Sequence, residues 1–331
     1  MIQPSPTFAP ERSPVTGRLP YFILGGAMKS GTTTLHHMLA RHPRIFMPDP
    51  EIHFFCLDDI TQMPDLFARF GGQWSFPDYE AHFETYLDWY RRFFAPARTE
   101  QLVGEDSTVY LASEKAPARI KALLPHVKLV FLLRDPVDRT YSHYWHLVAT
   151  GRATWPFEQA LQYGPETMIT RSFYRRQLER YFALFPREQI RVILFERFVR
   201  NVRDVLSDLC SFLGVPYEEA MAAGDRHHNR ARTPRWVRLM LWQNRLLRGQ
   251  AVAPYAGFLP GMPAVERSVS GRLIRFVDRG LRYVNRREGR YPPMRPETRD
   301  FLARLFAREN AGLSDLIGQD VAAYWPSMRA S

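Results

Sequence analysis

Residues 22–35, Phe-Ile-Leu-Gly-Gly-Ala-Met-Lys-Ser-Gly-Thr-Thr-Thr-Leu, decide how the rest of the chain is organised. An apolar run enters a glycine-bounded turn that carries Lys29, and hydroxyl residues then lead into an apolar-periodic segment that ends near Pro43. This order predicts a strand, an anion-binding loop and a helix, because the free N–H groups and the dipole at a helix N-terminus attract phosphate-like groups. The usual P-loop places its Lys after the last glycine, whereas Lys29 precedes Gly31. We therefore expect a phosphate-like cradle that is not a standard nucleoside triphosphate loop.

The composition indicates a globular protein of a reducing compartment. The chain has 331 residues, of which 45% are hydrophobic and 14% aromatic, and this is enough for a sizeable core. No run reaches the roughly 18 apolar residues of a membrane helix, and the start of the chain lacks the apolar core of a signal peptide. Cys56 and Cys210 lie far apart, so neither a disulfide framework nor a zinc site is expected. We predict a flexible tail at residues 1–19 and a cytoplasmic location.

The formal net charge of +11 points to an anionic ligand or partner. Lysine occurs only at positions 29, 115, 121 and 128, and the other basic residues among the 45 are arginines. The compact ammonium of Lys and the planar fork of Arg are not interchangeable where a point charge must sit between small groups. A lysine in the loop of an arginine-rich chain is therefore consistent with a specific role for Lys29.

Strand and helix patterns alternate along the chain. After the loop region, residues 102–111 predict a short strand followed by a polar turn, and further strands are predicted at 127–133 and 189–195. Predicted helices occupy residues 79–94, 172–184 and 204–213, and another follows the polar turn and ends at residue 124. Such alternation is typical of a parallel sheet covered by helices, so we predict an α/β fold of three layers with a central, mainly parallel sheet. One domain is expected over residues 20–331. It carries a basic, partly helical insertion at about 225–290, with helical patches at 236–247 and 273–284, and ends in a helix at 298–317.

A second candidate site residue stands where the strand at 127–133 ends. Arg134 is followed by Asp135, a good helix cap, and by Pro136 at the first helical position. Open α/β sheets bind ligands at the carboxyl ends of their strands. Ser142 lies eight residues after Arg134, two turns into the next helix. Taken alone, this segment is explained equally well by an ion-paired arginine at a strand end.

A carboxylate and an imidazole lie close together in the aromatic segment that follows the first helix. If residues 51–55 are extended, Glu51 and His53 share one face. The alternative is an exposed glutamate beside a histidine at the edge of the core. The adjacent histidines at positions 36 and 37, and at 227 and 228, have no carboxylate or cysteine at ligand spacing, so no metal site is expected.

Taken together, the loop and the arginine strand resemble the cofactor site of the sulfotransferases that use 3′-phosphoadenosine 5′-phosphosulfate (PAPS). Residues 29–33, Lys-Ser-Gly-Thr-Thr, resemble the 5′-phosphosulfate loop of that family, and residues 133–144 resemble its 3′-phosphate motif, including the spacing from Arg to Ser. The segments at 50–55 and 104–107 are similar to those of the Golgi-type carbohydrate sulfotransferases. The resemblance implies a P-loop-NTPase-like fold, PAPS as cosubstrate, PAP as product and no metal.

The resemblance also implies roles for individual residues. Lys29 would stabilise the leaving oxygen, and Glu51 would be the general base, with His53 supporting it or taking part. The residues implied in cofactor binding are Lys29, Ser30, Gly31, Thr32, Thr33, Thr34, Arg134, Ser142 and, near the end of the insertion, Arg290.

The acceptor is left open, because the chain departs from the carbohydrate enzymes at two positions. Pro50 and Asp106 stand where those enzymes usually carry lysine. A hydroxyl or amine of a carbohydrate, lipid or secondary metabolite is expected as the acceptor, and nucleic acid is not. Several roles are open for the basic insertion: a groove for an anionic glycan, a peripheral contact with a membrane lipid, an acidic partner or a carrier-bound substrate, or a solvated face.

Two other functions compete with this interpretation. One is a P-loop kinase or nucleotide hydrolase, which would need a Mg²⁺-binding carboxylate at the end of a neighbouring strand. The other is an inactive, arginine-rich module that binds polyanions, whose affinity would weaken steeply with salt.

Overall fold

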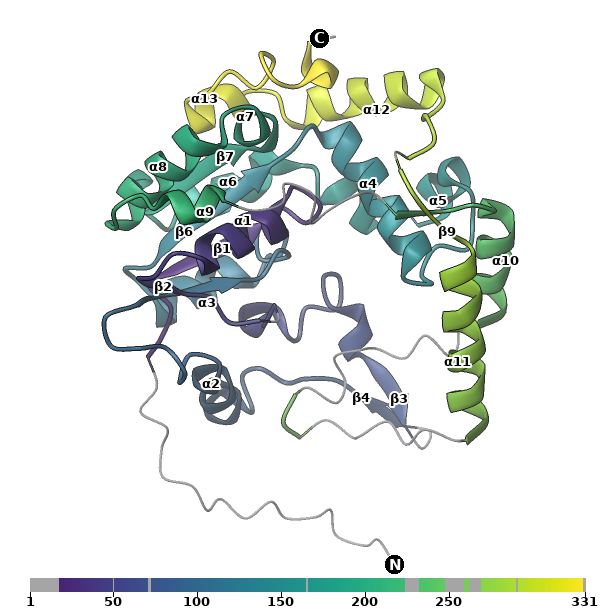
Figure 1. Ribbon diagram of the computed structural model, residues 1–331, viewed down its shortest axis with the longest axis horizontal. Helices are drawn as coiled ribbons and strands as arrows, with labels where there is room; N and C mark the ends of the chain where they lie inside the picture. Colours follow the sequence, from purple (N-terminus) through teal and green to yellow (C-terminus); the bar gives the residue numbers. More distant parts are fainter. Residues whose placement is uncertain are drawn as a thin grey trace, which may run out of the picture.

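Five parallel strands form the central sheet, in the order β2-β5-β1-β6-β7 (Figure 1). The computed structural model describes residues 18–49, 51–70, 73–164, 166–223, 232–247, 259–261, 269–289 and 291–329. The strands are β1 (Phe22–Gly26), β2 (Ile45–Phe46), β5 (Leu102–Asp106), β6 (Lys128–Leu133) and β7 (Ile190–Leu194). All five residues of β1 are buried, as are those of β6 after its first. The continuous apolar runs in the sequence therefore correspond to strands covered on both faces.

Helices cover both faces of this sheet. On one face lie α1 (Thr32–Ala40), α7 (Phe195–Arg200), α8 (Val202–Leu213) and α9 (Glu219–Ala222), and on the other α2 (Phe83–Arg92), α3 (Ala116–Leu123) and α6 (Tyr174–Phe182). Side chains of β1 alternate between the two cores: Phe22 and Leu24 belong to the first and Ile23 to the second. The predicted three-layer α/β fold with a parallel sheet is confirmed.

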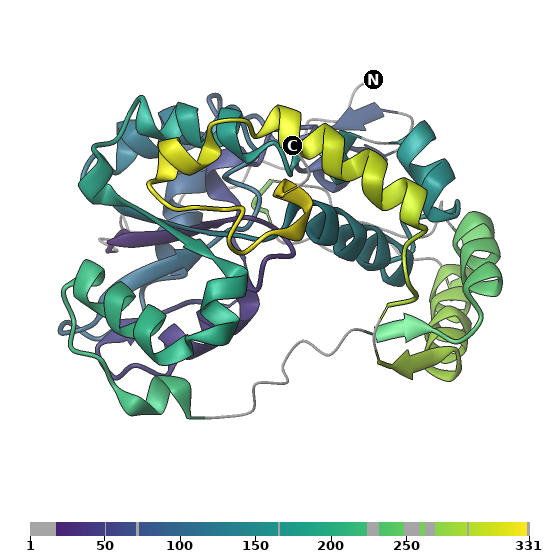
Figure 2. The ribbon, with the colours of Figure 1, turned by 90° about the horizontal axis from the view of Figure 1, so that it is seen from above.

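A third group of helices packs beside the sheet. It contains α4 (Pro136–Ala149), α5 (Phe157–Tyr163), α10 (Val237–Leu247) and α12 (Pro296–Glu309). The helix α11 (Val269–Val284) runs beside α10, and both lie at the edge of the molecule away from the sheet (Figures 1 and 2). Two short strands, β8 (Arg232–Pro234) and β9 (Arg286–Glu288), pair antiparallel and join the ends of this helical pair. A hairpin of β3 (Ala68–Phe70) and β4 (Gln73–Ser75) completes the strands.

The predicted terminal helix at 298–317 is two helices. The helix α12 ends at Glu309, and α13 covers Leu313–Ile317. Gly312, between them, has φ 78°, a left-handed conformation that interrupts a helix and favours glycine. The predicted helix at 79–94 is also shorter, since it begins at Phe83.

The expectation of an extended segment at 51–55 is wrong. Residues Phe54–Cys56 form a single turn of 3₁₀ helix, and His53 before them has φ 61°. Phe54, Phe55 and Cys56 are all fully buried, whereas a strand would point alternate side chains to opposite faces. Burying three consecutive apolar side chains in one core therefore favours the turn.

Several predictions fall wholly or partly outside the described residues. These are the tail before residue 18, parts of the insertion, and Arg290. Within the described residues, no helix combines the length and apolar character needed to cross a bilayer.

Candidate active site

The loop between β1 and α1 adopts a backbone conformation that requires glycine at position 31. Gly31 has φ 91°, and a Cβ atom at this position would lie 2.7 Å from the ring of Phe195, so any side chain would be strained and would clash. Lys29 also has a positive φ, 70°. The loop therefore passes close to the start of α7, and the N-terminus of α1 follows Lys29 directly. The free N–H groups at a helix N-terminus bind anions.

Arg134 lies across from this loop, at the carboxyl end of β6. Its Nη1 donates a hydrogen bond to the carbonyl of Lys29 (3.4 Å), and its guanidinium lies 5.2 Å from the centroid of the Phe195 ring. The carboxylate of Asp135 accepts from the N–H groups of Val137 and Asp138 and caps α4, as the sequence predicts. Because β1 and β6 are neighbouring parallel strands, the loop and the arginine meet at the carboxyl ends of these strands.

One cavity of about 900 Å³ brings most of the predicted site residues together. Its lining includes seven of the nine residues predicted to bind the cofactor, together with the predicted base: Lys29, Gly31, Thr32, Thr33, Thr34, Arg134, Ser142 and Glu51. Ser30 is fully buried, and its Oγ receives no hydrogen bond from the described part of the chain. Arg290 lies outside the described residues, although Tyr291, which follows it, lines the cavity.

Lys29 carries an unusually perturbed ammonium group. Burial is the largest cause that lowers its pKa, and the positive charge of Arg134 lowers it further, while Glu51 raises it. Lys29 and Arg134 therefore converge on one cavity beside Glu51. A third cationic group in the lining, Arg299, pairs with the second carboxylate there, Asp138, at 2.9 Å. Such a concentration of positive charge in a buried site is stabilised by an anionic ligand.

Glu51 is held firmly by the turn after β5. The backbone N–H and the hydroxyl of Thr108 both donate to its Oε2, at 3.0 and 2.7 Å. Nε2 of His53 lies 3.6 Å from the same oxygen. These contacts all engage Oε2, and Glu51 lines the cavity, so Oε1 is the carboxylate oxygen that we assign to a substrate. Glu51 and His53 thus lie side by side as predicted, although the backbone between them is not extended.

His53 is itself fixed by a buried polar network. Its backbone N–H donates to the Oγ of Ser107 (2.9 Å), whose hydroxyl donates to Glu105 (2.7 Å). The hydroxyls of Tyr90 and Tyr110 also donate to Glu105, both at 2.5 Å. Burial raises the pKa of Glu105 and lowers that of His53. The network anchors the turn at 53–56 to β5 and so fixes the position of the candidate base.

His36 has a carboxylate partner in space, although none stands at ligand spacing along the chain. Nδ1 of His36 lies 3.5 Å from Oδ2 of Asp106, at the end of β5. The partner comes from another element, so spacing along the chain could not show it. Burial raises the pKa of Asp106 to about 7. Among the described residues, no three His, Cys, Asp or Glu side chains gather as a metal site would need.

Several residues of the cavity were not predicted. Thr108 and Phe195 follow the ends of β5 and β7, and that position is the signal by which they could have been found. His146 is four residues after Ser142 on α4 and therefore shares its face. Burial and the nearby charge of Lys29 lower the pKa of His146 to about 4. Trp145, Tyr291 and Arg299 add aromatic and basic side chains to the lining of the cavity.

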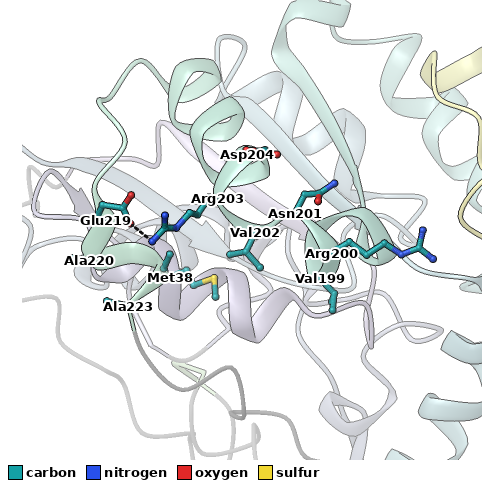
Figure 3. A pocket seen from close by; sticks show the side chains of 11 residues that line it. Met38, Val199, Arg200, Asn201, Val202, Arg203, Asp204, Glu219, Ala220 and Ala223 are labelled. Atoms are coloured by element: carbon teal, nitrogen blue, oxygen red, sulfur yellow. Dashed lines mark ion pairs between the residues drawn. The ribbon is translucent and has the colours of Figure 1, made fainter.

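A smaller cavity of about 440 Å³ adjoins the first (Figure 3). Met38, Val199 and Val202 line both cavities. Arg203 in this smaller cavity pairs with Glu219 at 3.2 Å, the dashed contact in Figure 3. None of the predicted site residues lines it, so the chemistry is to be sought in the larger cavity.

Comparisons with known proteins agree with this geometry. The profile described as "Sulfotransferase family" matches residues 20–219. A crystal structure of a sulfotransferase from Alicyclobacillus acidocaldarius is similar over 93% of this chain and 99% of that one, with a TM-score of 0.59 and 27% identity.

Curated relatives match about three fifths of the chain. Human bifunctional heparan sulfate N-deacetylase/N-sulfotransferase 3 is 28% identical over 223 residues, which are 62% of this chain and 24% of that protein. Human heparan sulfate glucosamine 3-O-sulfotransferase 5 is 26% identical over 211 residues, 60% of this chain and 54% of that protein. The chain thus spans about a quarter of the length of the first relative and about half of that of the second. With more than half of its residues matched by the family profile, the chain belongs to the sulfotransferase family.

Proposed function

We propose that this chain transfers the sulfuryl group of PAPS to a hydroxyl or amine of an acceptor, with Glu51 as general base. The observation that carries the proposal is the cavity in which the Lys29 loop, Arg134 and Ser142 meet beside Glu51. The two halves of this site are about a hundred residues apart in the sequence, and the parallel pairing of β1 with β6 brings them together.

The cavity suits a nucleotide with two anionic ends. The N-terminus of α1 and Lys29 form one cationic position, and Arg134 with Ser142 forms the other. The buried Oγ of Ser30, which has no partner among the described residues, is a further donor beside the loop. Aromatic side chains, Phe195 at one wall and Trp145 at another, offer surfaces for a base.

The side chains around the cavity match the requirements of sulfuryl transfer. PAPS supplies an activated sulfuryl group. The acceptor oxygen or nitrogen forms a bond to sulfur while the bond between sulfur and the bridging phosphosulfate oxygen breaks. The electron pair of the broken bond stays on that oxygen. Lys29 would stabilise the charge that develops there. Glu51 would take the acceptor proton on Oε1, because Oε2 is engaged by Thr108. His53 would orient Glu51 from its buried position.

The kinase alternative is weakened by the carboxylates at the strand ends. Asp106 ends β5 and Asp135 follows β6, the two neighbours of β1. Asp106 pairs with His36, and Asp135 caps α4. Neither lines the cavity formed by the described residues, whereas a metal-dependent phosphoryl transferase needs a metal-binding carboxylate at the end of a neighbouring strand. The carboxylates that do line the cavity have other partners, since Glu51 accepts from Thr108 and Asp138 pairs with Arg299.

We further propose a carbohydrate or small-molecule acceptor. Heparan sulfate appears in the names of the relatives cited above. The chain differs from the family pattern at Asp106, whose side chain is buried against His36 and so is not available to an anionic sugar. The acceptor of this chain therefore need not be the heparan sulfate of those relatives.

A thermal-shift panel of PAP, ATP and GTP, each with and without Mg²⁺, separates the candidates. Stabilisation by PAP that does not need metal is the expected result. Stabilisation by ATP only with Mg²⁺ would favour the kinase. Equal, salt-sensitive stabilisation by every polyanion would favour the inactive binding module.

A further inference from the structure

The helix α10 carries two apolar faces, and only one of them is used by the fold. Met240 and Leu241 pack into the core that α4 shares with α12, and the amide of Asn244 donates to the carbonyls of Val148 (3.0 Å) and Ala153 (2.8 Å). On another face, large apolar side chains recur at the three- and four-residue spacing of one helical stripe and are exposed: Leu239 by 45%, Trp242 by 61% and Leu246 by 60%. The exposed stripe is therefore not needed to anchor α10.

The neighbouring helix supplies a matching stripe. Val277, Leu281 and Val284 of α11 are each about half exposed or more and, with the α10 stripe, line an apolar groove of about 410 Å³. We call this surface, Leu239, Trp242 and Leu246 with Val277, Leu281 and Val284, the α10–α11 face. It lies on the helical pair at the edge of the molecule (Figure 2).

The polar groups in this groove already have partners. The amide of Gln243 donates to the carboxylate of Asp278 (2.6 Å). The side chain of Asn285 accepts from the N–H of Trp236 (2.8 Å) and donates to its carbonyl (3.2 Å). Since these groups are satisfied, the groove offers apolar contact and no polar recognition site.

Exposed arginines flank the α10 side of the α10–α11 face. Arg238 and Arg245 are exposed beside the α10 stripe, and Arg235 and Arg287 are exposed at the end of the helical pair where β8 pairs with β9. The single acidic residue in the sequences of α10 and α11 is Asp278, and its carboxylate pairs with Arg282 at 2.8 Å. The face thus combines exposed apolar side chains with an excess of arginine over acidic residues in the two helices.

We propose that the α10–α11 face docks on an anionic phospholipid bilayer. Tryptophan concentrates at the boundary between headgroups and acyl chains, leucine and valine stabilise contact with the acyl region, and arginines attract anionic headgroups. The net charge of +11 favours approach to such a surface. A second copy of the chain fits less well, because a symmetric contact would bring the same arginines against one another.

Docking through this face would bring the active-site cavity near the bilayer. Nη1 of Arg282 donates to the carbonyl of Ala149 (3.2 Å), and Ala149 lines the cavity. The helix α4 therefore connects the membrane face to the site. This inference does not depend on the proposed reaction, since vesicle binding is measured without turnover.

Sedimentation with vesicles tests the proposal on the full chain. We expect binding to vesicles of mixed phosphatidylcholine and phosphatidylglycerol and little binding to phosphatidylcholine alone. Trp242→Ala should lower the partition coefficient roughly tenfold, as expected for removal of a large apolar contact. The double variant Arg238→Glu/Arg245→Glu should lower it by about tenfold or more. Trp74→Ala on β4 and Arg304→Glu on α12, also at exposed positions, are the matched controls and should bind as the parent does.

Three results would overturn the proposal. The first is no binding to anionic vesicles, and the second is an equal loss of binding in the control variants. The third is a dimer that forms with rising protein concentration in sedimentation velocity and is abolished by Trp242→Ala, in the absence of vesicle binding. That result would identify a second copy of the chain as the occupant of the face. Circular dichroism of each variant establishes that the fold is kept.

Discussion

Thr108 binds the candidate base twice, because its backbone N–H and its hydroxyl both donate to Oε2 of Glu51. Hydrogen bonds to a charged group contribute about 1.5–3 kcal/mol each, so the pair fixes one carboxylate oxygen and leaves Oε1 to the acceptor. A residue that acts through Glu51 in this way should affect turnover and not nucleotide binding.

Thr108→Val should therefore lower kcat by about ten- to a hundredfold while PAP affinity is unchanged. The variant keeps the backbone donor and the side-chain shape and loses the hydroxyl alone. Thr108→Ser restores the hydroxyl and should recover most of the activity. Steady-state kinetics and PAP titration calorimetry measure the two effects. Equal activity of the Val and Ser variants would show that the hydroxyl does not position Glu51.

Lys29→Ala should reduce turnover by about 10²- to 10³-fold, the usual cost of removing one donor from a developing negative charge. Lys115→Ala is the matched control, because Lys115 lies at the surface in an ion pair with Asp58. Circular dichroism should show the same fold for both. Normal turnover of Lys29→Ala would remove Lys29 from the leaving-oxygen role.

Arg134→Ala should weaken PAP binding by about a hundredfold, because a buried, charge-assisted contact to a phosphate would be lost. Arg134→Lys keeps the charge and loses the planar fork, so it should recover only part of the affinity. Calorimetry with PAP gives both values, and Arg304→Ala is an exposed control. Unchanged PAP affinity in Arg134→Ala would place the nucleotide elsewhere.

His146 should make the nucleotide-free protein less stable in mild acid. Its folded-state pKa of about 4 lies below its ordinary value of 6.5. Between these values the unfolded chain takes up a proton that the folded chain refuses, so stability is lost as pH falls from 6.5 towards 4. In His146→Gln, the drop in unfolding free energy between pH 7 and pH 5 should be smaller by about 1–2 kcal/mol.

Urea unfolding at the two pH values measures this difference. His126→Gln, at an exposed position of the chain, is the control and should keep the drop seen in the parent. If the His146 and His126 variants behave alike, protonation of His146 does not govern stability in this range.

The sequence allowed the strands and the nucleotide loop to be predicted because their signals are local. Apolar runs such as the one ending at Arg134 can be buried on both faces only in a parallel sheet, and the glycine at position 31 marks a backbone that no other residue fits. The order of these elements was then enough to bring Lys29 and Arg134 to one edge of the sheet.

Contacts between distant segments could not be predicted in this way. Thr108 is 57 residues from Glu51, and Asp106 is 70 residues from His36, so no spacing rule joins either pair. The turn at His53 was not predicted because a positive φ is unfavourable for histidine taken alone. Burial of the aromatic residues that follow it offsets this cost, and that burial depends on packing against distant parts of the core.

Transfer of labelled sulfate from PAPS to a panel of glycan, lipid, phenolic and peptide acceptors tests the central claim most directly. With the parent protein we predict a labelled product from at least one class, in the absence of added metal. With Glu51→Gln we predict PAP binding equal to that of the parent and a loss of turnover of about 10²- to 10⁴-fold. Full activity of Glu51→Gln, or failure of the parent protein to bind PAP at all, would contradict the account.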